Sequence, residues 1–203
     1  MKNYIIGCGG FAKDVYCILK RNKINFNGFI GIEKTIIKTQ EEEHTSILEQ
    51  EILSFNNLDV NFYIGVGSPS ILYKIKEKYS KFNFPNLIDP DSKVLGKINL
   101  GNGNIICSNT IFTTDITIGS FNIFNFGCTI GHDASIGDCN VFNPSCCISG
   151  NVKIINNNLF GVNSTILEGV SISSNNIVGG SALVTKNIQE MGIYIGVPAK
   201  RKL

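Results

Sequence analysis

The sequence predicts a small α/β unit followed by a long parallel β-helix with three faces. Two periodicities predict the β-helix: an apolar residue recurs at every sixth position of residues 94–184, and an asparagine recurs at every eighteenth position of residues 104–176. A period of six within a period of eighteen is typical of a coil with three short sides, each placing one apolar residue inward before a corner. The apolar positions are Val94, Leu100, Ile106, Phe112, Ile118, Phe124, Ile130, Ile136, Phe142, Ile148, Ile154, Phe160, Ile166, Ile172, Val178 and Val184.

Residues eighteen apart should stack on successive coils and form columns of related chemistry. The polar column is Asn104, Asn122, Asn140, Asn158 and Asn176. The aliphatic column is Ile98, Ile116, Ala134, Val152 and Val170, and the column of small residues is Thr110, Cys128, Cys146, Ser164 and Ala182. Because strands stack about 4.8 Å apart, we expect the asparagine amides to form a chain of hydrogen bonds along the axis.

Alternating strands and helices predict the α/β unit, which we assign to residues 1–86. Strands are expected at residues 2–6, 26–32 and 62–66, with one helix after the first strand and another at residues 70–79. Glycines at the strand ends favour a parallel sheet. Residues 33–57 are expected to form a surface connection with some helix. The β-helix with a C-terminal cap is assigned to residues 87–203.

Composition argues against several classes of protein. The chain has 203 residues and a net charge of +2, and its 18 basic residues form no stripe with aromatic residues, so nucleic acid is not an expected partner. No apolar run reaches the roughly 18 residues that span a bilayer, and no signal peptide is recognisable, so we expect a cytoplasmic protein without membrane insertion. The seven cysteines show no zinc spacing and are expected to be reduced packing residues, with no metal site.

A glycine-rich turn follows the first predicted strand. Residues 7–12 read GCGGFA, and such a turn at a helix N-terminus can hold a phosphate with backbone N–H groups. A tight turn without a ligand stays open as the alternative. Glu33 is a poor match to the acid of a dinucleotide site, so a Rossmann-like unit holding a nucleotide sugar is favoured. The candidate substrate-binding residues are Gly7, Cys8, Gly9, Gly10, Phe11, Gly67 and Ser68.

Histidine is scarce, and one of the two histidines lies within the repeat. His44 lies in a polar run, whereas His132 stands two residues after an inward position and directly before Asp133. A histidine beside a carboxylate can act as a general base near neutral pH. A solvated surface histidine is the alternative that the residues themselves leave open.

Four segments carry a resemblance to a known family. They are the GCGGFA turn, IGHDASIGD at residues 130–138, GNVKI at residues 150–154 and GVPAKR at residues 196–201. Together they resemble the bacterial sialic-acid O-acetyltransferase-like sugar acetyltransferases over nearly the whole chain. The nearest resemblance is to bacillosamine-pathway enzymes that N-acetylate nucleotide-linked 4-amino-4,6-dideoxy sugars. The resemblance implies a left-handed β-helix of hexapeptide repeats.

The resemblance also implies site residues and partners. It assigns His132 as the base and Asp133 as its assistant, with homotrimers holding acetyl-CoA in the cleft between neighbouring β-helices. The cofactor contacts that it implies are Gly150, Val162, Gly179, Gly180, Lys200 and Arg201.

The sequence departs from the family pattern at three places. Gly31 and Ile32 stand where the family often has an acidic pair. Asp89 and Val141 each stand where a histidine is common in the family. The first two departures concern the substrate, and the third concerns the cofactor.

The expected function is acetyl transfer from acetyl-CoA to the 4-amino group of a UDP- or dTDP-linked 4-amino-4,6-dideoxy sugar, for surface glycan biosynthesis such as that of O-antigen. Direct attack is expected, because no cysteine or serine lies beside a second histidine. O-acetylation of a sugar or sialic acid is one alternative, and a non-catalytic trimer that binds a sugar nucleotide is another. The sequence does not decide among UDP, dTDP and GDP.

Overall fold

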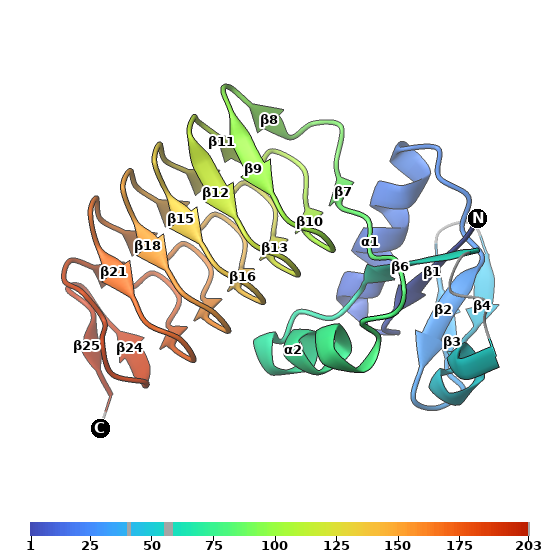
Figure 1. Ribbon diagram of the computed structural model, residues 1–203. Helices are drawn as coiled ribbons and strands as arrows, with labels where there is room; N and C mark the ends of the chain where they lie inside the picture. The colour runs from blue at the N-terminus through green and yellow to red at the C-terminus, as the bar shows by residue number, and fades with distance from the viewer. Residues whose placement is uncertain (40–41, 55–58, 203) are drawn as a thin grey trace.

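The computed structural model describes residues 1–39, 42–54 and 59–202. It contains the two predicted parts, an α/β unit and a parallel β-helix, joined by a short connection (Figure 1). The fold class predicted from the sequence is therefore confirmed.

The N-terminal unit is built on a four-stranded parallel sheet of order β5-β2-β1-β6. Its elements are β1 (Lys2–Ile6), α1 (Gly10–Arg21), β2 (Gly28–Gly31), β3 (Ile36–Lys38), β4 (Glu43–Thr45), β5 (Ile47–Leu48), the 3-10 helix η1 (Glu49–Ser54), β6 (Val60–Ile64) and α2 (Pro69–Lys78). Alternating strands and helices thus produce the expected parallel sheet, with apolar faces of both helices buried.

The connection expected over residues 33–57 has more structure than the sequence indicated. β3 and β4 form an antiparallel hairpin, and η1 supplies the expected helix. The hairpin was obscured in the sequence because its strands are three residues long and largely exposed. Residues 40–41 and 55–57 of this connection lie outside the described residues.

The β-helix has three faces, each a parallel sheet of short strands stacked along the axis. The first face contains β7 (Leu87–Ile88), β10 (Ile105–Ile106), β13 (Ile123–Phe124), β16 (Val141–Phe142), β19 (Leu159–Phe160), β22 (Ile177–Val178) and the cap strands β24 (Ile193–Ile195) and β25 (Lys200–Arg201). The second contains β8 (Lys93–Val94), β11 (Ile111–Phe112), β14 (Thr129–Ile130), β17 (Cys147–Ile148), β20 (Thr165–Ile166) and β23 (Leu183–Val184). The third contains β9 (Ile98–Leu100), β12 (Ile116–Ile118), β15 (Ser135–Ile136), β18 (Lys153–Ile154) and β21 (Ser171–Ile172).

The predicted asparagine column is a continuous hydrogen-bonded ladder in the interior. The Oδ1 of Asn122 accepts the backbone N–H of Asn140 at 2.8 Å and its side-chain Nδ2 at 3.1 Å. Asn158 repeats both contacts with Asn140, at 2.9 and 3.1 Å. Each of these amides is buried, and those of Asn122 and Asn140 also donate to the carbonyls of Gly137 and Ile155. The ladder satisfies polar groups that would otherwise be costly to bury.

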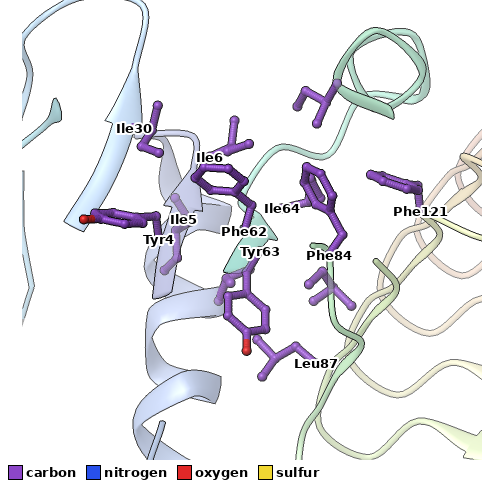
Figure 2. Close-up of a cluster of buried hydrophobic side chains, with 14 of the residues drawn as sticks. Tyr4, Ile5, Ile6, Ile30, Phe62, Tyr63, Ile64, Phe84, Leu87 and Phe121 are labelled. Atoms are coloured by element: carbon purple, nitrogen blue, oxygen red, sulfur yellow. The ribbon is translucent and has the colours of Figure 1, made fainter. Parts of the chain in front are cut away.

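The N-terminal unit packs on the outside of the first face. Phe84 contacts Phe121, with ring centroids 4.9 Å apart, and Leu87 continues the same buried cluster (Figure 2). Ile105, Ile123 and Val141 point outward from the first face and are buried against the N-terminal unit. Apolar packing thus fixes the relative position of the two parts.

An ion pair links α2 to the β-helix. The Nζ of Lys76 lies 2.5 Å from Oδ2 of Asp138, and the other carboxylate oxygen accepts the N–H of Ser120 at 2.7 Å. Partial burial opposes ionisation of Asp138, but the Lys76 ammonium and the Ser120 N–H together keep the pKa of this carboxyl below its usual value. Hydrogen bonding to Asp138 correspondingly raises the pKa of Lys76.

Asn140→Ala should destabilise the protein by about 3 kcal/mol, because it removes the amide and leaves the N–H and side chain of Asn158 without their buried acceptor. Urea unfolding followed by circular dichroism measures the change. Asn99→Ala, at an exposed outward position of β9, is the control and should change the free energy of unfolding by less than about 0.5 kcal/mol. Equal effects of the two changes would contradict the role of the ladder.

Lys76→Met should lower the free energy of unfolding at pH 7 by about 1 kcal/mol, since the ion pair is about one-third exposed and partly screened. A depressed carboxyl pKa stabilises the folded state above the unfolded value of about 3.9 and loses this effect as pH falls through the folded value. The difference between Lys76→Met and the wild type should therefore shrink below about pH 4. A difference that stays constant down to pH 3 would contradict the assignment.

Candidate active site

His132 and Asp133 form a hydrogen-bonded pair on an edge of the β-helix. They follow β14, at the corner between the second and third faces. Asp133 adopts a left-handed backbone conformation with φ of 58°, which Asp tolerates better than most residues. Its Oδ2 lies 2.7 Å from Nδ1 of His132, and the histidine side chain is 51% exposed. The hydrogen bond to Asp133 raises the pKa of His132 above its usual value.

Gly150 lies against the imidazole, one coil further along the axis. A Cβ on Gly150 would come within 2.6 Å of both Cε1 and Nε2 of His132. The next residue, Asn151, donates its N–H to the carbonyl of His132 at 2.8 Å. The ring therefore occupies the space that any larger side chain at this position would need, and Nε2 is directed along the edge rather than into the core.

Val162, Gly179 and Gly180 lie on a different edge. They follow β19 and β22, at the corner between the first and second faces. Gly161 and Gly180 make a close approach between successive coils there, because a Cβ on Gly161 would lie 2.4 Å from N of Gly180. The second face therefore separates these candidate cofactor residues from His132 and Gly150 within one chain.

The two basic candidates lie in the C-terminal cap. β25 pairs antiparallel with β24. Arg201 is held within the chain, because Nη1 lies 2.6 Å from Oε2 of Glu190 and Nη2 donates to the carbonyl of Met191 at 2.9 Å. Lys200 is exposed.

The glycine turn borders a cavity at the carboxyl ends of β1, β2 and β6. Gly7 and Cys8 line this cavity of about 320 Å³ together with residues 30–33 and Val66. Gly7 requires its glycine, since φ is 128° and a Cβ would lie 2.6 Å from the carbonyl oxygen of Gly65. Gly9 and Gly10 begin α1 with open space beside them.

The other predicted substrate residues do not all face this cavity. Phe11 packs against the core of the N-terminal unit. Gly67 faces open space, and Ser68 lines a separate groove between the start of α2 and the first face, where Leu159 and Ile177 form the wall. Of the residues predicted as one substrate cleft, Gly7 and Cys8 thus line one hollow and Ser68 lines another.

Each departure from the family pattern has a structural explanation. A Cβ on Gly31 would lie 2.8 Å from Sγ of Cys8, so an acid does not fit there while the thiol is in place. Asp89 is 2% exposed and lies 3.0 Å from Nε of Arg21, where it helps to hold α1 to the β-helix. Val141 is buried beneath the N-terminal unit.

Ile32 is 86% exposed, and it lies beside an acid that the sequence analysis undervalued. Glu33 is a poor match to the acid of a dinucleotide site, but it lines the cavity beside the glycine turn. Its position directly after the predicted second strand was the available signal.

Glu168 is a residue that the sequence analysis missed. Its charge acts on His132 and contributes to the raised pKa of that histidine. The signal was available in the repeat, since Glu168 follows His132 by two periods of eighteen residues.

Within residues 1–39, 42–54 and 59–202, no three His, Cys, Asp or Glu residues gather in a way that could hold a metal ion. In the same part of the chain, no helix is both long and apolar enough to cross a bilayer. The cysteines are free thiols, and Cys128 and Cys146 stack in the buried column of small residues.

Comparison with family models identifies the N-terminal part of the chain. Residues 2–79 match the model of the PglD N-terminal domain. The comparison with curated proteins found no match.

Solved structures match the whole length. PerB from Caulobacter crescentus, in complex with CoA and GDP-perosamine, is 23% identical with a TM-score of 0.92, over 100% of this chain and 97% of PerB. The acetyltransferase domain of PglB from Neisseria gonorrhoeae, in complex with acetyl coenzyme A, is 21% identical with a TM-score of 0.89, over 99% and 98%. WeeI from Acinetobacter baumannii is 21% identical with a TM-score of 0.88, over 100% of both chains.

These matches confirm the resemblance that four sequence segments carried. Residues 2–79 thus resemble the PglD N-terminal domain, and the whole chain has the fold of PerB and of the PglB acetyltransferase domain.

Proposed function

We propose that this protein transfers an acetyl group from acetyl-CoA to the 4-amino group of a nucleotide-linked 4-amino-4,6-dideoxy sugar, in the cytoplasm and for surface glycan biosynthesis. The observation that carries the proposal is the exposed His132–Asp133 pair beside Gly150, on a β-helix joined to a PglD-type N-terminal unit. The similarity to PerB and to the PglB acetyltransferase domain supports the same reaction class.

His132 has the geometry of a general base. Asp133 accepts a hydrogen bond from Nδ1–H of His132, which leaves the lone pair of Nε2 free to take a proton from the amine. The amine nitrogen attacks the thioester carbonyl, the C–N bond forms and the C–S bond breaks, and His132 returns a proton to the departing thiolate. A backbone N–H near Gly150 stabilises the oxyanion of the intermediate. No acyl-enzyme is part of the proposal.

The proposed assembly is a homotrimer with acetyl-CoA between neighbouring β-helices. His132 and Gly150 lie on one edge of the prism, and Val162, Gly179 and Gly180 lie on another. Two neighbouring chains can bring these edges together, which one chain does not do by itself. Lys200 in the cap is available for the coenzyme phosphates, while Arg201 would first have to leave Glu190.

The sugar nucleotide is assigned to the cavity beside Gly7 and Cys8, with the N-terminus of α1 directed at its diphosphate. UDP and dTDP are the expected nucleotides, and the GDP sugar bound by PerB adds GDP to the compounds to be tested. A hydroxyl acceptor would use the same base, so a sialic-acid acceptor belongs in the same panel.

His132→Ala should lower kcat about 1,000-fold, the range expected for loss of a general base. Thiol release from acetyl-CoA is measured with UDP-, dTDP- and GDP-linked 4-amino-4,6-dideoxy sugars and with sialic acid. The variant should keep the thermal protection that acetyl-CoA gives the wild type, because its fold and coenzyme contacts remain. Transfer at the wild-type rate by His132→Ala would overturn the mechanism, and absence of protection in the wild type would favour the non-catalytic alternative.

Asp133→Asn should shift the acid limb of the kcat/KM profile to lower pH. A base acts only when neutral, so activity falls as pH drops through its pKa. The Asp133 hydrogen bond holds that pKa above about 6.5, the ordinary value for histidine. Removing the charge should lower the pKa of His132 and also reduce the maximal rate, since the tautomer is less well fixed. An unshifted acid limb would show that another group titrates.

A further inference from the structure

His132, Gly150 and Glu168 occupy successive positions of one column at the edge between the second and third faces. The backbone hydrogen bonds define the column, because Asn151 N–H donates to the carbonyl of His132 at 2.8 Å and Gly169 N–H donates to the carbonyl of Gly150 at 3.0 Å. Glu168 therefore stands two coils beyond His132, about 9.6 Å along the axis at the usual strand spacing.

Gly150 stands between His132 and Glu168 in this column. It has no side chain of its own, and the edge of the imidazole that carries Cε1 and Nε2 lies over it. Nε2 is thus on the side of the ring nearer Glu168, with no intervening side chain in the column. His132 and Glu168 are therefore consecutive side chains along this edge of the β-helix.

The carboxylate of Glu168 is available for a ligand. Glu168 is exposed, and across the described ranges no donor forms a hydrogen bond or ion pair with its side chain. Its charge nevertheless acts on His132. The other charge that acts on the imidazole is that of Asp133 on the same corner. One coil earlier, Asp115 accepts a hydrogen bond from the hydroxyl of Thr114 at 3.1 Å.

We propose that the Glu168 carboxylate binds the ammonium form of the acceptor and holds its nitrogen beside Nε2 of His132, so that this site selects an amine over a hydroxyl. The inference rests on the proposed acetyl transfer and deepens it, because it assigns the acceptor class to a residue of this chain. A hydroxyl group is neutral and gains much less from a carboxylate than an ammonium does.

The proton balance of the step is complete. The bound ammonium loses one proton to Nε2 of His132, which passes it to solvent. The amine then attacks the thioester carbonyl, the C–N bond forms and the C–S bond breaks. The second proton leaves the nitrogen to His132 and is returned to the thiolate, so the products are the amide and free CoA thiol. The Glu168 carboxylate stabilises the two positive charges of this step, the ammonium of the sugar and the imidazolium of His132.

A nuclear magnetic resonance titration tests, without any substrate, whether the charge of Glu168 acts on His132. The chain has two histidines, so His44 serves as an internal reference for the Cε1–H signal of His132. Glu168→Gln should lower the pKa of His132, whereas Glu77→Gln, an equal change of charge on the exposed face of α2, should leave it unchanged. An equal pKa of His132 in the wild type and in Glu168→Gln would overturn the inference.

Kinetics test the selection of the amine. The probes are dTDP-4-amino-4,6-dideoxyglucose and GDP-perosamine, each paired with its counterpart carrying a hydroxyl at C4. Glu168→Gln should raise the KM of the amino sugar about tenfold and should leave the inhibition constant of the hydroxyl counterpart unchanged, while Glu168→Asp should recover part of the loss.

The outcomes separate this inference from the function on which it rests. Equal losses for the amine and hydroxyl compounds would overturn amine selection by Glu168, even if acetyl transfer is established. If the wild type transfers acetyl only to a hydroxyl acceptor, the assignment of an amine is overturned as well. If the wild type acetylates none of the probes, the proposed function fails, and the His132 titration decides whether Glu168 acts on the imidazole.

Discussion

The buried asparagine ladder is the constraint on which the rest of the structure depends. Each amide bonds to the next at an interval of eighteen residues, and each is fully enclosed by the coils. A coil with one residue more or fewer would break this chain and leave buried donors unsatisfied, which is costly. The ladder therefore fixes the register, and the register places His132, Gly150 and Glu168 in one line.

The stacked aromatic rings reinforce this register. Phe124, Phe142 and Phe160 stack with centroids 4.8 Å apart and nearly parallel planes, so the polar and apolar columns repeat with the same spacing. The corners, in contrast, hold Asp, Asn, Ser and Gly residues in left-handed backbone conformations, which these residues tolerate. The corner between the second and third faces is where chemistry-bearing side chains can change without disturbing the core.

The junction with the N-terminal unit explains why Asp89 and Val141 stand at two positions where the resembled family commonly has a histidine. The first face presents Ile105, Ile123 and Val141 to that unit, and Asp89 holds Arg21 at its border. These residues stabilise the arrangement of the two parts and are not available as ligands. The His132–Asp133 pair lies on an edge that this packing does not cover, so the same chain provides a rigid junction and an exposed histidine.

The repeat period by itself determined the β-helix, its inward residues and the asparagine ladder, because a strict period converts sequence separation directly into neighbours along the axis. Adjacency in the sequence indicated the pairing of His132 with Asp133. The glycine turn and the alternation of strands likewise determined the parallel sheet. Only the tertiary structure decided that Ser68 faces a different groove from Cys8. That relation depends on how α2 and the N-terminal sheet pack on the first face, and contacts between separate elements carry no fixed interval in the sequence.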